Sequence, residues 1–215
     1  MTKIASMLPS FSKPDLTPEQ WAEVDRRAEE AVKAEADQKR KERLERSGIP
    51  LIYQDAKLDL CEDAVRSYKE GSLLLQGKPG RGKTYSACAI LMDRIKEHPV
   101  RFVTMERLLR ECKACFNGQD TEANVIGRYT GTKLLCLDDI GKERLTEWSL
   151  PIFFSIINER LENDRPTIIT TNYTGAELMS CFTVNNDAQT VYAIVSRMSG
   201  YQRIVLDGED RRAVK

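Results

Sequence analysis

The sequence has a single histidine, no net charge and no apolar run that approaches the length of a membrane-spanning helix. Among 215 residues, 33 Lys and Arg balance 33 Asp and Glu, so any affinity for a nucleic acid must come from a local patch. Cys112 and Cys115 form one C-x-x-C without a second pair, which we interpret as helix packing and not as a zinc site. The N-terminus also lacks an apolar signal segment. We therefore expect a cytoplasmic protein with reduced thiols and no membrane contact.

A glycine-rich segment lies between a short apolar run and a stretch of helix-forming residues, and it fits the pattern of a phosphate-binding loop. Its glycines let successive N–H groups point at an anion, and the helix that follows adds the positive end of its dipole. Lys83 is placed to reach the β- and γ-phosphates, and Thr84 to ligate magnesium. A glycine-rich turn that binds nothing is the alternative, which the flanking strand and helix disfavour. The segment comprises Gly77, Lys78, Pro79, Gly80, Arg81, Gly82, Lys83 and Thr84.

Polar residues close two further apolar runs. Asp138 and Asp139 follow residues 134–137, which read as a strand buried on both faces. We predict Asp138 as the magnesium partner and Asp139, pointing the other way, as the group that polarises an attacking water. Asn172 follows the β-branched run 167–171 and is placed to orient that water, although it could also cap the next turn. A turn or a helix cap is likewise the alternative for the two acids.

Strand and helix patterns alternate from residue 51 onward, which predicts an α/β fold with a parallel sheet flanked by helices. We expect a loose tail over residues 1–16, a charged helix over 17–47 that is a possible partner-binding arm, and an ATPase domain over 48–215. The expected strands lie near 72–76, 100–104, 133–138, 167–171 and 202–206. The expected helices lie near 59–69, 84–97, 106–116, 146–163, 175–181 and 188–199.

With these residues in place, the chain resembles the AAA+ ATPases of the DnaC/DnaI helicase-loader and IstB transposition-helper group. The resemblance covers about residues 44–212 and implies a P-loop NTPase fold of AAA+ type with a five-stranded parallel sheet and a reduced lid. The matching segments are RSGIP at 46–50, GKPGRGKT, LLCLDDIG with Lys142-Glu143 after it, Trp148, Asn158-Glu159-Arg160, ITTN, Glu177-Leu178, Ser196-Arg197-Met198 and the terminal Asp207 to Arg212.

The resemblance implies ATP and Mg2+ as cofactors, and weak ATP hydrolysis by a lone subunit that self-associates through its ATP site. It assigns Asn172 to the sensor of the γ-phosphate and Arg197 to an arginine that acts at the nucleotide, within its own chain or in the next subunit. The chain departs from the group at Ala193, where loaders often carry another arginine, and at Arg211, where the group favours an aromatic residue. Its N-terminal region is also shorter than a loader's usual helicase-binding domain.

The leading function that follows is an ATP-dependent helicase loader that binds single-stranded DNA and hands a replicative helicase onto DNA. In the group, DNA is bound between the second strand and the acidic strand, and cations interleaved with aromatics suit such binding. An amphipathic helix that buries Leu108, Leu109 and Phe116 is the alternative for this region. The predicted DNA contacts are Phe102, Arg107, Arg110, Lys113 and Arg128, with Phe116, Tyr129 and Lys133 nearby.

Two alternative functions stay open. An IstB-like transposition helper would remodel double-stranded DNA as an ATP-dependent filament, with a transposase as its partner. An adaptor would use ATP only as an assembly switch with vestigial hydrolysis, which the residue Ala193 favours. A small-molecule kinase fits less well, because few cations follow Asn172 to form a substrate lid.

Overall fold

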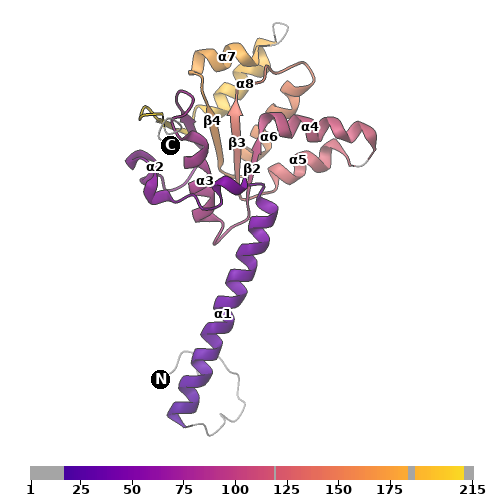
Figure 1. The fold of residues 1–215 in the computed structure, drawn as a ribbon. Helices are drawn as coiled ribbons and strands as arrows, with labels where there is room; N and C mark the ends of the chain where they lie inside the picture. The colour runs from indigo at the N-terminus through magenta and orange to yellow at the C-terminus, as the bar shows by residue number, and fades with distance from the viewer. Residues whose placement is uncertain (1–16, 119, 184–186, 211–215) are drawn as a thin grey trace. The chain divides into compact units, whose positions relative to one another are not determined.

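The computed structural model describes residues 17–118, 120–183 and 187–210 (Figure 1). The predicted tail at 1–16 and the terminal Arg211 and Arg212 lie outside these residues. The chain divides into two units, residues 1–42 and 43–215. Within the described ranges, no helix combines the length and the apolar character that crossing a bilayer requires.

The described part of the first unit consists almost wholly of the charged helix α1 (Pro18–Ser47), whose last turn belongs to the second unit. A capping box is present at its start. The Thr17 N–H donates to Gln20 Oε1 at 2.8 Å, and the Gln20 N–H donates to Thr17 Oγ1 at 3.3 Å. Ion pairs one turn apart, such as Arg26 with Glu23 at 2.7 Å, add a few tenths of a kcal/mol each, roughly, to a solvated helix.

The second unit is built on five parallel strands in the order β2-β3-β4-β1-β5. Every neighbouring pair is parallel, so the carboxyl ends of all five strands lie at one edge of the sheet. The strands are β1 (Leu73–Gln76), β2 (Val100–Thr104), β3 (Leu134–Ile140), β4 (Thr167–Thr171) and β5 (Gln202–Val205).

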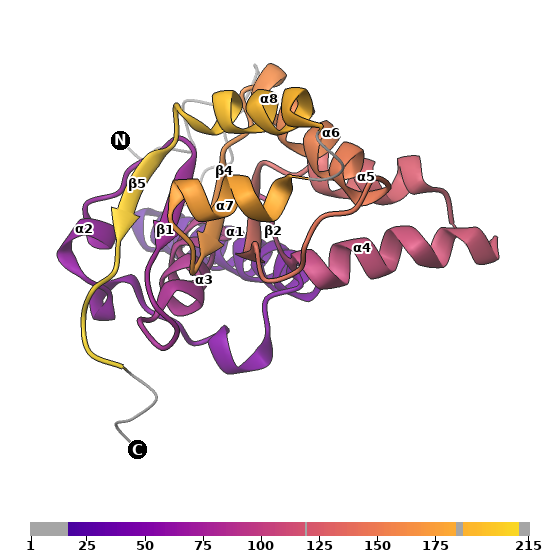
Figure 2. The ribbon, with the colours of Figure 1, turned by 90° about the horizontal axis from the view of Figure 1, so that it is seen from above.

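Helices cover both faces of the sheet, and alternate residues of β3 show why. Leu134 and Cys136 enter one hydrophobic cluster, whereas Leu135 and Leu137 enter the other, as the period of two requires. In the view from above, α3 and α8 lie on opposite sides of the strands (Figure 2). The first face is covered by η1 (Leu51–Tyr53), η2 (Leu58–Leu60), α2 (Asp63–Arg66) and α3 (Lys83–Arg94). The second is covered by α4 (Met105–Ala114), α5 (Glu122–Thr130), α6 (Ser149–Glu162), α7 (Gly175–Phe182) and α8 (Ala188–Met198), with η3 (Cys115–Asn117) after α4.

One helix prediction was wrong, and one helix was missed. The helix expected over 59–69 is interrupted, because Cys61 and Glu62 take extended backbone angles, with ψ of 166° and 153°. Burial of Cys61, Val65 and Tyr68 in the first cluster fixes this segment in place of helical propensity. The sequence reading also missed α5, although Thr121 caps it by accepting the Asn124 N–H at 3.2 Å. The remaining predicted elements lie within about three residues of those observed.

A buried arginine ties the far ends of several elements together. Arg160 on α6 is 0% exposed, and burial is the main cause that lowers its pKa to about 10, so it stays charged at neutral pH. No carboxylate within the described ranges forms an ion pair with it. Its guanidinium instead donates to Thr167 Oγ1 and to the carbonyl oxygens of Tyr129, Thr130, Thr132, Lys133 and Pro166, at 2.5–3.4 Å.

Candidate active site

The glycine-rich loop connects β1 to α3 at the carboxyl edge of the sheet. Gly82 stands at the N-cap of α3 with φ of 81° and ψ of 15°, a left-handed conformation that costs glycine little. Directly after it, the first turn of α3 leaves N–H groups without helical partners, which suits an anion. Lys83 is 5% exposed, and its ammonium donates to the carbonyl oxygens of Gly77 at 2.8 Å and Lys78 at 3.0 Å. The lysine is therefore held inside the loop that it would serve.

Thr84 and Asp138 meet at this edge although 54 residues separate them in the sequence. The Thr84 hydroxyl lies 3.0 Å and 3.3 Å from the two carboxylate oxygens of Asp138. A third side chain, Thr170 on β4, donates to Asp138 Oδ1 at 2.7 Å. The sequence reading missed Thr170, because its position opposite Asp138 depends on strand register and not on any local pattern.

The surroundings of Asp138 suit a hard divalent cation. The residue is 4% exposed, and this burial raises the pKa of its carboxyl to about 6, with the neighbouring Asp139 adding to the rise and the bonds from Thr170 and Thr84 opposing it. Within the described ranges the carboxylate makes no ion pair at 4 Å or less. Mg2+ needs only one or two protein oxygen ligands when phosphates and waters complete its coordination shell. The Thr84 hydroxyl and the Asp138 carboxylate lie side by side and can supply them. These residues therefore fit a magnesium ion.

Asp139 is turned into the site by an irregularity in β3. The strand runs two residues beyond its predicted end, and its pairing with β4 shifts register between Leu137 and Ile140. Asp139 has φ of 57°, and its N–H donates to Thr170 Oγ1 at 2.9 Å. Such a bulge re-aims a side chain at a cost of about 1–3 kcal/mol for the left-handed backbone. As a result Asp139 lines a cavity together with Asn172, which follows β4.

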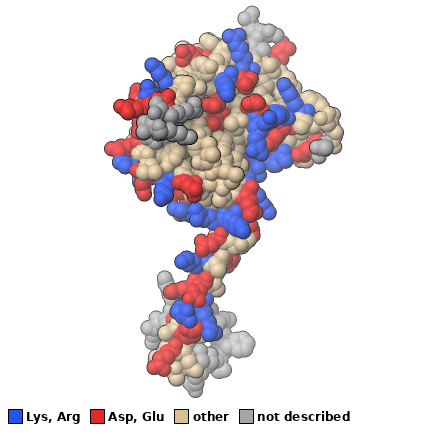
Figure 3. Space-filling view, in the orientation of Figure 1, with Lys and Arg blue, Asp and Glu red and all other residues tan. Residues whose placement is uncertain are grey.

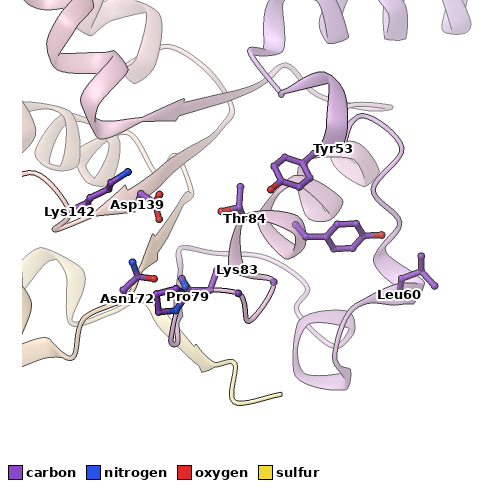
Figure 4. Close-up of a pocket in the computed structure, with 11 residues that line it drawn as sticks. Tyr53, Leu60, Pro79, Lys83, Thr84, Asp139, Lys142 and Asn172 are labelled. Carbon is purple, nitrogen blue, oxygen red and sulfur yellow. The ribbon is translucent and has the colours of Figure 1, made fainter. Parts of the chain in front are cut away.

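This cavity has a volume of about 650 Å³ and two chemically different ends (Figure 4). Asp139, Lys142 and Asn172 form the polar end. At the other end the rings of Tyr53 and Tyr85 meet edge to face with centres 6.5 Å apart, and the Tyr85 hydroxyl accepts the Lys57 N–H at 3.1 Å. The lining residues are Tyr53, Leu60, Pro79, Gly80, Gly82, Lys83, Thr84, Tyr85, Asp139, Lys142 and Asn172.

The cavity has the room and the chemistry for a nucleotide whose base would lie at the aromatic end and whose phosphates would lie along the loop. Tyr53, Leu60, Tyr85 and Lys142 were missed as site residues by the sequence reading. Tyr85 directly follows the Lys-Thr pair and could have been found from that spacing. Tyr53 reaches the cavity only through the path of the chain after α1, which no motif specifies.

Arg197 does not line the cavity. It lies on α8, where its Nε donates to Asn158 Oδ1 at 2.5 Å and its Nη1 donates to the Ala193 carbonyl at 3.1 Å. Its guanidinium carbon stands 4.7 Å from the centre of the Phe154 ring. The structure thus gathers the loop, both acids and Asn172, and leaves Arg197 against α6.

The predicted DNA contacts separate into different environments. Phe102 was wrongly chosen, since it is 5% exposed and packs in the core against α3. Arg107 is paired with Glu111 at 2.9 Å, and Arg128 with Asp120 at 3.3 Å. Basic and acidic side chains are correspondingly interspersed over the region of α4 and α5 (Figure 3).

Arg110 and Lys113 instead line a hollow of about 360 Å³ together with Arg144 and Trp148. The Lys113 ammonium lies 5.4 Å from the centre of the Trp148 ring. Phe116, which the alternative interpretation of this helix places in the core, is 76% exposed. It lies beside the Trp148 indole, with ring centres 6.3 Å apart. The alternative is correct for Leu108, which is 0% exposed.

Comparison with known proteins identifies relatives of this arrangement. Residues 57–213 match the family described as IstB-like ATP binding protein. The chain is 30% identical over 163 residues to the replicative helicase loader DnaI of Bacillus subtilis (strain 168), covering 70% of this chain and 51% of that protein. It is 27% identical over 145 residues to the replicative helicase loader DnaC of Escherichia coli (strain K12), covering 59% of each. The crystal structure of DnaI superposes with a TM-score of 0.64 at 22% identity, covering 76% of this chain and 94% of that one. The chain spans between half and three fifths of the length of these two curated relatives.

Proposed function

Because the chain belongs to the family of IstB-like ATP-binding proteins and has the AAA+ P-loop fold of the DnaI and DnaC group, we propose that it is an ATP-dependent helicase loader. The observation that carries the nucleotide part is the 3.0 Å contact between Thr84 and Asp138. It joins the phosphate-binding loop to the acidic strand end, where a magnesium-bound triphosphate needs both. The identity of the partner rests on the relatives, of which the chain spans only part.

The proposed reaction is hydrolysis of ATP to ADP and phosphate. A magnesium ion held by Thr84 and Asp138 would neutralise charge on the β- and γ-phosphates. Asp139 lies in the cavity next to Asn172, where its carboxylate can accept a hydrogen bond from the attacking water and orient it. The N–H groups of the loop and of the first turn of α3 hold the phosphates in place. Positioning and electrostatics therefore supply most of the rate, as in other phosphoryl transfers.

We further propose that single-stranded DNA binds along the hollow beside α4. The lining carries three cations, Arg110, Lys113 and Arg144, against two acids, so a small positive excess faces the phosphate backbone. Trp148 with the exposed Phe116 gives ring faces for bases. Base stacking on such rings contributes roughly 1–3 kcal/mol per base. Arg107 and Arg128 contribute less in this proposal, because acidic neighbours already pair with them.

Arg197 is proposed to act between subunits. It is partly exposed on α8 and lies outside its own chain's cavity, which supports delivery to a neighbouring subunit after self-association. An arginine supplied in this way accelerates phosphoryl transfer by about a thousandfold or more. An isolated subunit would then hydrolyse ATP slowly.

Capture of the partner tests the proposal. Affinity-tagged Asp139→Asn protein, which should retain ATP, is incubated in an extract of its native host with ATP or with ADP, and Lys83→Ala serves as the matched control. Recovery of a replicative helicase with ATP, and not with the control, supports the loader. Recovery of a transposase, together with ATP-dependent filaments on double-stranded DNA, supports the transposition helper instead. ATP turnover by the wild-type protein that stays negligible at every protein concentration supports the adaptor.

A further inference from the structure

Lys142 is a cation of the nucleotide cavity that neither the phosphate-binding loop nor the acidic pair accounts for. It lies three residues beyond Asp139 and lines the polar end of the cavity. Its side chain is exposed and makes no hydrogen bond or ion pair within the described ranges. In the close-up its ammonium end lies toward Asp139, across the cavity from Thr84 (Figure 4). Within the described ranges, Lys142 is therefore the basic side chain at the end of the cavity that Asp139 and Asn172 also line.

The backbone before Lys142 fixes this direction. The Lys142 N–H donates to the Asp139 carbonyl at 3.4 Å, which closes a turn over the acid. Gly141, with φ of 95°, occupies the middle of the turn, and a Cβ there would lie 2.7 Å from the Tyr173 ring and 3.0 Å from the Leu178 side chain. A side chain at this position would therefore clash with both neighbours, and the positive φ is one that only glycine adopts readily. The stem of Lys142 leaves this turn on the cavity side.

Among the described residues, few positive charges lie near the polar end of the cavity. Lys83 is the other basic residue that lines it within the described ranges, and its ammonium is held inside the loop by the carbonyl oxygens of Gly77 and Lys78. Arg197 is held on α6 by Asn158 and Phe154. Asp139 and Asn172, which flank the expected γ-phosphate, bring a negative charge and a neutral amide. Lys142 is thus the basic side chain at the polar end of the cavity, where it can add to the loop lysine in balancing the charge of a terminal phosphate.

We propose that Lys142 is a phosphate-contacting residue that binds the terminal phosphate of ATP within its own subunit. The proposal rests on the proposed ATPase function and deepens it. Since ADP lacks that phosphate, Lys142 should distinguish ATP from ADP, whereas Lys83 should bind both. A second cation in the same chain would also let a subunit retain basal turnover before any arginine arrives from a neighbour.

The test compares Lys142→Met with Lys69→Met, an exposed lysine remote from the cavity, as the control. Affinities for ATP and ADP with magnesium are measured by competition against a fluorescent ADP analogue, and a thermal melt checks that each variant folds. We expect Lys142→Met to weaken ATP about tenfold, to change ADP less than about twofold, and to lower turnover about tenfold. Lys142→Arg should restore part of the ATP affinity, because the charge is kept. The control should match wild type.

Three results would overturn the proposal. Equal losses of affinity for ATP and ADP would mean that the substitution acts through long-range electrostatics or a structural change, and not through the terminal phosphate. If the wild type binds ATP and Lys142→Met binds it equally well, Lys142 does not contact the phosphate, and the ATPase proposal still stands. If the wild type binds neither nucleotide, the ATPase proposal fails as well. Restored turnover on mixing Lys142→Met with Lys83→Ala subunits would show that the lysine acts on a neighbour.

Discussion

Replacing Asp138 by asparagine measures how much a buried carboxylate without a bound cation lowers the free energy of unfolding. Burial is the main cause that raises its pKa from 3.8 to about 6. An acid whose pKa is higher in the folded state than in the unfolded state loses stability as the pH rises through the interval between the two values. A pKa difference of this size corresponds to about 3 kcal/mol of lost stability at pH 7.5.

We expect Asp138→Asn to be more stable than wild type by about 2–3 kcal/mol at pH 7.5 in the presence of a chelator. The asparagine oxygen can still accept the hydrogen bond of the Thr170 hydroxyl, so little of the gain is lost to an unsatisfied donor. For a chain of this size the melting temperature should rise by about 4–10 °C. The gain should fall to about half at pH 5, where part of it has already been titrated away.

Urea unfolding at several pH values checks this, with Asp93→Asn as the control. Asp93 is a partly exposed carboxylate on α3 that pairs with Lys96 at 3.1 Å, and its replacement should change stability by less than about 1 kcal/mol. With magnesium and ATP at a hundred times the dissociation constant, wild type should gain about 2.7 kcal/mol and Asp138→Asn much less. A variant that is less stable than wild type at pH 7.5, or a gain that does not vary with pH, would refute the reasoning.

Four further substitutions have distinct expected results. Lys83→Ala should abolish binding of both ATP and ADP in a fluorescent-nucleotide titration, and unchanged affinity would reject the loop assignment. Asp139→Asn should keep ATP bound and slow turnover by about a hundredfold or more, measured as phosphate release; normal turnover would assign the water to another group. Arg197→Ala should lower turnover with little change in ATP affinity, and mixing it with Lys83→Ala should restore activity if the arginine acts across subunits. Arg160→Met should lower the free energy of unfolding by about 3 kcal/mol or more in urea, since several buried carbonyls lose their donor; a neutral result would contradict its linking role.

The parts of the site that the sequence predicts are those whose geometry follows from local pattern and sheet direction. The loop glycines and the Lys83-Thr84 pair imply a helix N-terminus, and the apolar run before Asp138 implies a strand. Parallel strands end at one edge, so these motifs must converge without any knowledge of the loops between them. The same logic correctly brought Asn172 to that edge.

The parts that it missed depend on register and on paths through loops. Phe102 lies in a run that alternates between the two faces of the sheet, and only its pairing with Cys136 shows that it faces α3. Asp139 has a left-handed backbone because β3 and β4 slip against each other, which the residues of β3 alone do not specify. Lys142 enters the cavity because Gly141 packs under Tyr173, a contact between segments that meet only in the folded chain.

Thr170 links the positions of the two acids and Asn172. Its hydroxyl donates to Asp138 Oδ1 at 2.7 Å and accepts the Asp139 N–H at 2.9 Å, so one side chain holds both the Asp138 carboxylate and the bulge that aims the other acid. Two residues later the same strand delivers Asn172 to the cavity. Any shift of β4 against β3 would therefore move all three groups together, since the hydroxyl cannot keep both bonds otherwise. Thr170→Val, which keeps the shape and removes the hydroxyl, would leave a buried carboxylate short of a donor and release the bulge, and so should weaken both magnesium binding and ATP turnover.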